Sequence, residues 1–137
     1  MKILAVDIGT GTQDILLFDS RVDIENSLKM VQPSPTMITH RRIKAATRKG
    51  KSVLLTGVTM GGGPSHWAAE AHIEAGFPLY ATPDAARSFN DDLEVVREFG
   101  VTVVSVDEAE KLDSDVVRLE LKDFDLTAIE DAFSRFE

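Results

Sequence analysis

The chain has 137 residues, of which 43% are hydrophobic and 28% charged, and it contains no cysteine. This composition is typical of one globular domain, and no apolar run approaches the roughly 20 residues of a membrane helix. The N-terminus carries no signal-peptide pattern, so we expect a cytoplasmic protein without a membrane segment. The absence of cysteine excludes disulfides, cysteine-bound iron–sulfur clusters and a catalytic thiol in this chain.

The formal net charge of −8 is unevenly distributed along the chain. Residues 1–83 carry nine basic and seven acidic side chains, whereas residues 84–137 carry six basic and sixteen acidic ones. The acidic excess disfavours nucleic acid as a partner. No aromatic residues are interleaved with the one basic cluster, so we interpret it as a solvated helix face rather than a nucleic-acid site. The cluster consists of Arg41, Arg42, Lys44, Arg48, Lys49 and Lys51.

Residues 1–19 are predicted to form a β-hairpin. Two apolar runs, 3–6 and 15–18, flank a short turn that contains glycine. An alternating segment, 27–31, predicts a third and partly exposed strand after the hairpin.

The hairpin turn has an unusual composition for a simple connector. Gly9 and Gly11 would permit positive φ and close approach of a ligand, while Thr10 and Thr12 would add hydroxyl groups. Asp7 ends the first strand, where a carboxylate can hold hydrated Mg²⁺ beside phosphates. A plain turn chosen for its geometry is the alternative, and spacing does not decide between the two interpretations.

A helix is predicted over 36–49, where Gly50 ends it, and a buried strand over 52–56. The continuous apolar run of that strand is typical of the centre of a parallel sheet.

A glycine-rich stretch and a second helix, 64–75, follow the buried strand. Strand, glycine-rich loop and helix N-terminus form the general layout for holding a phosphate, so Gly61, Gly62, Gly63 and Ser65 are candidate anion-binding residues. The stretch is not a P-loop, because no Gly-Lys-Ser/Thr follows. Close packing of the helix on the strand is the alternative explanation of the glycines.

Helical spacing places one set of residues on a single face of this second helix, namely Trp67, Ala68, Ala71, His72 and Ala75. His72 is therefore interpreted as a core or edge histidine rather than a ligand. His66 lies in the first helical turn near any bound anion, but no partner that would orient it for catalysis is evident.

The rest of the chain alternates between strands and helices. Short strands are predicted over 77–81 and 101–106, separated by a helical region that breaks near Ser88 or Asn90. An alternating strand over 117–121 precedes an amphipathic helix that starts at Leu126. Phe89, Leu93 and Val96 are expected to be mostly buried.

Residues 6–12, with the sequence VDIGTGT, resemble the first phosphate motif of the actin, Hsp70 and sugar-kinase superfamily. Together with TGVTMGGGP at residues 56–64, they more closely resemble a prokaryotic family whose members are labelled pyruvate formate-lyase activating enzymes. Gln13 stands where the superfamily often has Lys, Ser or Asn, a difference that concerns catalysis more than phosphate binding.

The superfamily resemblance implies an α/β, ribonuclease-H-like (actin-like ATPase) fold. Such a fold has one mixed central sheet, in which an antiparallel three-stranded meander is followed by parallel strands, with helices on both faces. The first strand would be central, with strand 52–56 parallel on its other side. Residues 1–137 would form a single domain and the N-terminal half of a longer, two-domain protein that closes on ATP and Mg²⁺.

The resemblance also implies binding of a nucleotide or phosphate at the hairpin of residues 1–19, without turnover by a lone half of an ATPase or phosphotransferase. The two glycine-rich stretches would then flank one crevice, with Asp7 available to Mg²⁺. A second actin-like half or a second copy is the expected partner, and a non-catalytic partner-binding module is the alternative function. A radical-SAM activating enzyme is rejected, because it needs a cysteine-bound cluster. The implied binding residues are Asp7, Gly9, Thr10, Gly11, Thr12, Gln13, Gly61, Gly62, Gly63 and Ser65.

Overall fold

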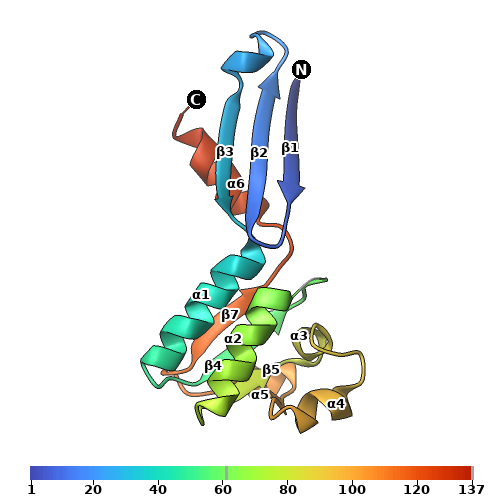
Figure 1. The fold of residues 1–137 in the computed structure, drawn as a ribbon, viewed down its shortest axis with the longest axis vertical. Helices are drawn as coiled ribbons and strands as arrows, with labels where there is room; N and C mark the ends of the chain where they lie inside the picture. Colours follow the sequence, from blue (N-terminus) through green and yellow to red (C-terminus); the bar gives the residue numbers. More distant parts are fainter. Residues whose placement is uncertain (61, 137) are drawn as a thin grey trace. The chain divides into compact units, whose positions relative to one another are not determined.

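The computed structural model describes residues 1–60 and 62–136 (Figure 1). The fold is mixed α/β, with one three-stranded antiparallel sheet and one four-stranded parallel sheet. The chain divides into two compact units, Met1–Ser34 with Phe124–Glu137, and Pro35–Asp123. Among the described helices, none is both long and apolar enough to cross a membrane.

The antiparallel sheet of the first unit has the strand order β1-β2-β3. Strand β1 (Lys2–Ile8) and strand β2 (Thr12–Asp19) form the predicted hairpin, and β3 (Leu28–Pro33) is the predicted third strand. A short 3₁₀ turn, Ile24–Asn26, joins β2 to β3. The meander predicted from the sequence is therefore confirmed.

Helix α6 (Leu126–Ser134) covers one face of this sheet, as its amphipathic sequence predicts. The Asp125 carboxylate accepts a hydrogen bond from Ala128 N (3.1 Å) and so caps the helix. Every second strand residue points to the same face, so a small core forms between sheet and helix. Its buried members are Ile15, Ile129 and Phe133, packed against Leu4, Val6, Leu17, Leu28 and Met30.

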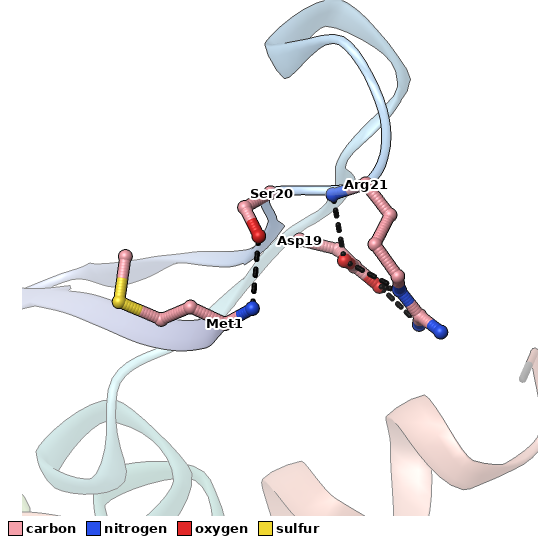
Figure 2. A network of polar contacts seen from close by, with 4 residues as sticks. All are labelled: Met1, Asp19, Ser20 and Arg21. Atoms are coloured by element: carbon pink, nitrogen blue, oxygen red, sulfur yellow. Dashed lines mark hydrogen bonds and ion pairs between the residues drawn. The ribbon is translucent and has the colours of Figure 1, made fainter.

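Polar contacts close the open end of the hairpin (Figure 2). The Met1 ammonium donates to Ser20 Oγ (2.8 Å), and Arg21 Nε donates to both carboxylate oxygens of Asp19 (2.9 and 3.1 Å). The hydrogen bonds from Arg21 hold the pKa of Asp19 well below its usual range. Asp19 is therefore ionised, and it fixes the chain where it leaves β2.

The second unit is built on a parallel sheet with the strand order β6-β5-β4-β7. Strand β4 is the first strand of this sheet along the chain. Its apolar residues Val53, Leu54 and Leu55 are fully buried, because helices cover both faces of the sheet. The strands are β4 (Val53–Gly57), β5 (Leu79–Ala81), β6 (Thr102–Val103) and β7 (Val117–Leu121).

Helices lie on both faces of the parallel sheet, as predicted. The main core joins Leu55 and its neighbours to α1, α2, α3 and α4, while a smaller core joins Leu54 to α5. The predicted break between two helical pieces is confirmed by the separation of α3 from α4. The helices are α1 (Pro35–Arg48), α2 (Gly63–Glu74), α3 (Pro83–Arg87), α4 (Leu93–Glu98) and α5 (Val106–Glu110). The six basic residues of the cluster near α1 are all exposed, as expected of a solvated face.

The observed burial differs from the helical patterns in two places. Trp67, on the face identified from spacing, is 65% exposed, whereas Ala69, outside that face, is buried. Because α2 carries small apolar residues on several sides, spacing alone does not identify its buried face. Val96 is fully buried as predicted, whereas Phe89 and Leu93 are only half-buried.

The predicted position of β1 is wrong. Strand β1 lies at an edge of the antiparallel sheet, and β2 is its central strand (Figure 1). Strand β4 pairs with β5 on one side and with β7 on the other, so neither side is left for β1. The single mixed sheet implied by the actin-like resemblance is thus replaced by two sheets, and the ribonuclease-H-like assignment is not confirmed.

His72 is a core histidine, as predicted. Its side chain is fully buried, with Nε2 3.1 Å from Pro78 O and Nδ1 2.8 Å from Thr47 Oγ1. Burial lowers the pKa of this imidazole below its ordinary value of 6.5, because the charged form loses hydration. The folded protein therefore holds His72 neutral near pH 7.

We expect the free energy of unfolding to decrease as the pH falls below about 6.5, because the unfolded state then binds a proton that folded His72 does not. Urea unfolding at about pH 7.5 and about pH 5.5 measures this change. In His72→Gln the change attributable to this residue should disappear, whatever the absolute stability of the variant. An identical pH dependence in both proteins would contradict the assignment of a neutral His72.

Candidate functional site

The parallel sheet has a topological switch point between β4 and β7, where the order in which strands are added to the sheet reverses. The chain runs from β4 to β5 and β6 on one side, and then returns to β7 on the other side of β4 (Figure 1). The loops that follow β4 and β7 therefore start side by side at the carboxyl edge of the sheet. Open α/β sheets bind ligands in the crevice at such a point.

Gly57 ends β4 and brings the two loops together. Its φ is +73°, and a Cβ at this position would lie 2.3 Å from Leu121 O. Val58 N donates to the same carbonyl at 3.1 Å. Only glycine fits this left-handed turn against β7, so Gly57 is required by the close approach of two backbones.

Asp123, from the loop after β7, fastens the glycine-rich loop after β4. Its carboxylate accepts from Thr59 Oγ1 (2.5 Å) and from Met60 N (2.9 and 3.2 Å). On the other side, Thr59 N donates to Ser88 Oγ (3.3 Å). The segment that leads into α2 is therefore held from two directions before the helix begins.

Helix α2 begins without a side-chain cap. Its N-cap residue is Gly62, which has no side chain to accept a hydrogen bond from the first helical amides. The backbone bond from His66 N to Gly62 O (2.7 Å) is formed. Ser65 is buried, and its hydroxyl donates to Gly62 O (2.9 Å), so it stabilises the turn. Within residues 1–60 and 62–136, no atom lies within 4 Å of the position that a Cβ at Gly63 would take, so the described surroundings leave the start of the helix open. Gly61, the remaining predicted residue, lies outside the described residues.

His66 has an orienting partner that the sequence analysis missed. Its Nε2 lies 3.2 Å from Glu70 Oε1, one helical turn further along α2. The Phe89 and Phe99 rings meet the imidazole edge-on, with centroid distances of 5.0 and 6.0 Å. The i, i+4 spacing of histidine and glutamate was the available signal.

The hairpin turn is closed by a buried serine. Ser34 N donates to Gly11 O (3.0 Å), and Ser34 Oγ donates to Thr10 O (2.7 Å). Gly9 N donates to Thr12 O at 2.9 Å. Neither Gly9 nor Gly11 adopts positive φ, so the expected use of their conformational freedom is wrong. The turn closes through these hydrogen bonds without left-handed backbone.

The hairpin places two carboxylates at opposed positions on neighbouring strands. Asp7 and Asp14 are directly opposite in the β1–β2 register, and both are exposed. Side chains at opposed positions share one face of a sheet, and like charges there repel. A cation would relieve this repulsion, which supports Asp7 as a candidate metal ligand and adds Asp14.

Gln13 does not join this acidic pair. Adjacent strand residues point to opposite faces, so Gln13 lies on the other side of the sheet from Asp14. It is only 6% exposed, and its Nε2 donates to Pro33 O (3.0 Å). Among the described residues, Oε1 of Gln13 has no hydrogen-bond partner.

The two predicted glycine-rich stretches do not form one crevice through neighbouring strands. That expectation required β1 and β4 to be parallel neighbours, whereas they belong to different sheets. Each stretch therefore has to be judged as a separate candidate site.

A groove of about 480 Å³ also lies near the carboxyl ends of β4 and β5, on the α5 side. Its only cation among the lining residues is Arg118, which donates to Ala109 O and Leu112 O (both 2.9 Å). Asp84 and Glu110 line the same groove. With two carboxylates in its lining and its one cation bonded to backbone carbonyls, this groove is less suited to binding an anion than the start of α2 on the other face of the sheet.

These features define an α/β protein with an open glycine-rich helix start at the switch point of a parallel sheet. A family described as "Putative pyruvate format-lyase activating enzyme (DUF1786)" matches residues 60–137, more than half of the chain. The chain belongs to this family. No curated protein and no solved structure matches it.

The donor atoms of this chain do not fit a cysteine-bound iron–sulfur cluster. The sequence contains no cysteine. Within residues 1–60 and 62–136, no group of three or more His, Asp or Glu side chains is placed to hold a metal ion. Radical-SAM activation requires thiolate ligands, so no step of that chemistry can be assigned to these residues.

Proposed function

We propose that this chain binds a phosphate-bearing ligand, such as ATP, at the start of α2. The observation that supports this most is the fastening of the loop by Asp123, which fixes an uncapped helix N-terminus at the switch point of the sheet. A helix N-terminus attracts anions because its first amides lack partners and its dipole is positive there.

The amides of Gly62, Gly63 and Ser65 would receive the phosphate oxygens. They precede the first intrahelical hydrogen bond of α2, His66 N to Gly62 O. Among the described residues, no atom lies within 4 Å of the position that a Cβ at Gly63 would take, whereas a Cβ at Gly62 would lie 3.6 Å from Ser65 Oγ. Because the Asp123 carboxylate is hydrogen-bonded to the loop that leads into α2, we propose that Mg²⁺ accompanies the phosphate and offsets this negative charge.

Calorimetric titration with pyrophosphate and with ATP, in the presence and absence of Mg²⁺, tests the proposal. In Gly63→Asp a carboxylate would occupy the anion position, and binding should weaken at least ~10-fold through like-charge repulsion. The same carboxylate favours the helix N-terminus by roughly 0.3–1 kcal/mol, so lost binding would not reflect unfolding. Gly63→Asn, which has the same shape without the charge, should retain most of the binding.

The hairpin is a second candidate for the phosphate, supported by the opposed carboxylates Asp7 and Asp14. A Cβ at Gly11 would meet nothing within 4 Å, so Gly11→Asp and Gly11→Asn form a matched pair for this site. Loss of binding in Gly11→Asp alone would assign the phosphate to the hairpin. Asp7→Asn should then weaken binding only when Mg²⁺ is present. Absence of binding by the unaltered chain would favour the partner-binding module.

A further inference from the structure

The outer edge of β1 presents free backbone groups. The hydrogen bonds from Gly9 N to Thr12 O (2.9 Å) and from Ser20 N to Met1 O (3.0 Å) show that odd-numbered residues pair with β2. In an antiparallel ladder the alternate residues point the other way, so the N–H and C=O groups of Leu4, Val6 and Ile8 face outward. Within the described residues, no strand pairs with this edge.

The two edges of the antiparallel sheet differ in their protection. By the same alternation, the outward residues of β3 are Lys29, Val31 and Pro33. Lysine and proline are the residues that protect an edge, and proline has no N–H to offer. Strand β1 pairs with β2 in unbroken register, carries its one lysine at its first residue, Lys2, and contains no proline, so neither a bulge, a lysine nor a proline protects the edge from Ile3 to Ile8.

The side chains along β1 are also suited to pairing. Between Lys2 and Asp7 the strand is entirely apolar, and Ile3 and Ile8 are 45% and 41% exposed. A long, flat and apolar edge strand is a template for a further strand. We propose that β1 pairs antiparallel with β1 of a second copy of this chain, an inference independent of phosphate binding.

The sequence of β1 complements itself in one full-length register. With the two-fold axis at Ala5, Leu4 lies opposite Val6 of the partner, and Lys2 lies opposite Ile8 of the partner. Ile3 lies opposite Asp7 of the partner, so no like charges face each other. The outward backbone groups of Leu4 and Val6 then bond directly across the axis. The result is a symmetric six-stranded sheet with both copies of α6 on the same face.

Ala5 provides the sharpest test because it meets its own copy at the axis. The Cα atoms of such a non-hydrogen-bonded pair are about 4.5 Å apart. Ala5 is exposed and points away from α6, so the isolated chain tolerates a longer side chain there. Ala5→Lys and Ala5→Glu should each weaken self-association at least ~10-fold, because two like charges would face each other. An equimolar mixture of the two variants should associate again.

Sedimentation equilibrium over a range of concentrations measures each of these states. Val31→Lys is the matched control, since Val31 is 63% exposed on the same sheet face but belongs to the other edge strand. It should associate like the unaltered chain. An unaltered chain that remains monomeric at every concentration overturns the inference. So does undiminished association of Ala5→Lys, a mixture that fails to associate, or dissociation caused by Val31→Lys.

Discussion

Replacing Gly57 with alanine is expected to destabilise the unit Pro35–Asp123 by roughly 3 kcal/mol or more, since left-handed strain alone costs 1–3 kcal/mol. The added Cβ would lie 2.3 Å from Leu121 O and 3.1 Å from Leu121 N, and both atoms belong to the backbone of β7. A flexible side chain could move aside, but a paired strand cannot. Urea unfolding followed by circular dichroism measures the loss.

Gly76→Ala is the matched control for this substitution. Gly76 has a φ of +89°, but a Cβ there would meet nothing within 4 Å. Its replacement should therefore cost only the backbone strain, on the order of 1 kcal/mol. Equal losses in the two variants would show that the approach of β4 to β7 is not what requires Gly57.

Leu55→Ala should be similarly damaging, with a loss of roughly 2–5 kcal/mol in the free energy of unfolding. Leu55 is 1% exposed at the centre of the parallel sheet, in the main core under α1 and α2. Truncation removes apolar contacts and leaves a cavity that the packed strands cannot close. Chemical unfolding again provides the measurement.

Leu93→Ala provides the comparison for the core substitution, because Leu93 is only half-buried at the start of α4. Its loss should be clearly smaller than that of Leu55→Ala. A loss below ~0.5 kcal/mol for Leu55→Ala itself would mean that the core has been assigned to the wrong side chains.

Local patterns predicted most of the elements, because they depend on residues that are neighbours in sequence. The alternation at 117–121 and the apolar run inside β4 identified strands, and Gly50 marked the end of α1. Strand pairing depends instead on packing between distant segments. The apolar run of β4 indicates a central strand, but nothing in it selects β7 over β1 as the neighbour.

The candidate site was predicted only in part for the same reason. The glycine-rich loop and the start of α2 were evident, but the role of Gly57 was not predicted, because its close neighbour Leu121 is distant in sequence. Asp123 was missed, although a carboxylate directly after an alternating strand was an available signal. The contacts of Ser34 with the hairpin turn and of Ser88 with the glycine-rich loop could not be predicted, because only folding brings these distant segments together.

Amide chemical shifts recorded by NMR during a titration with Mg²⁺-pyrophosphate test the central claim most directly. The proposal predicts saturable shifts that are largest for the amides of Gly62, Gly63 and Ser65, and their loss in Gly63→Asp but not in Gly63→Asn. Shifts confined to Gly11 and its neighbours in the hairpin would contradict a site at α2, as would a spectrum that the ligand leaves unchanged.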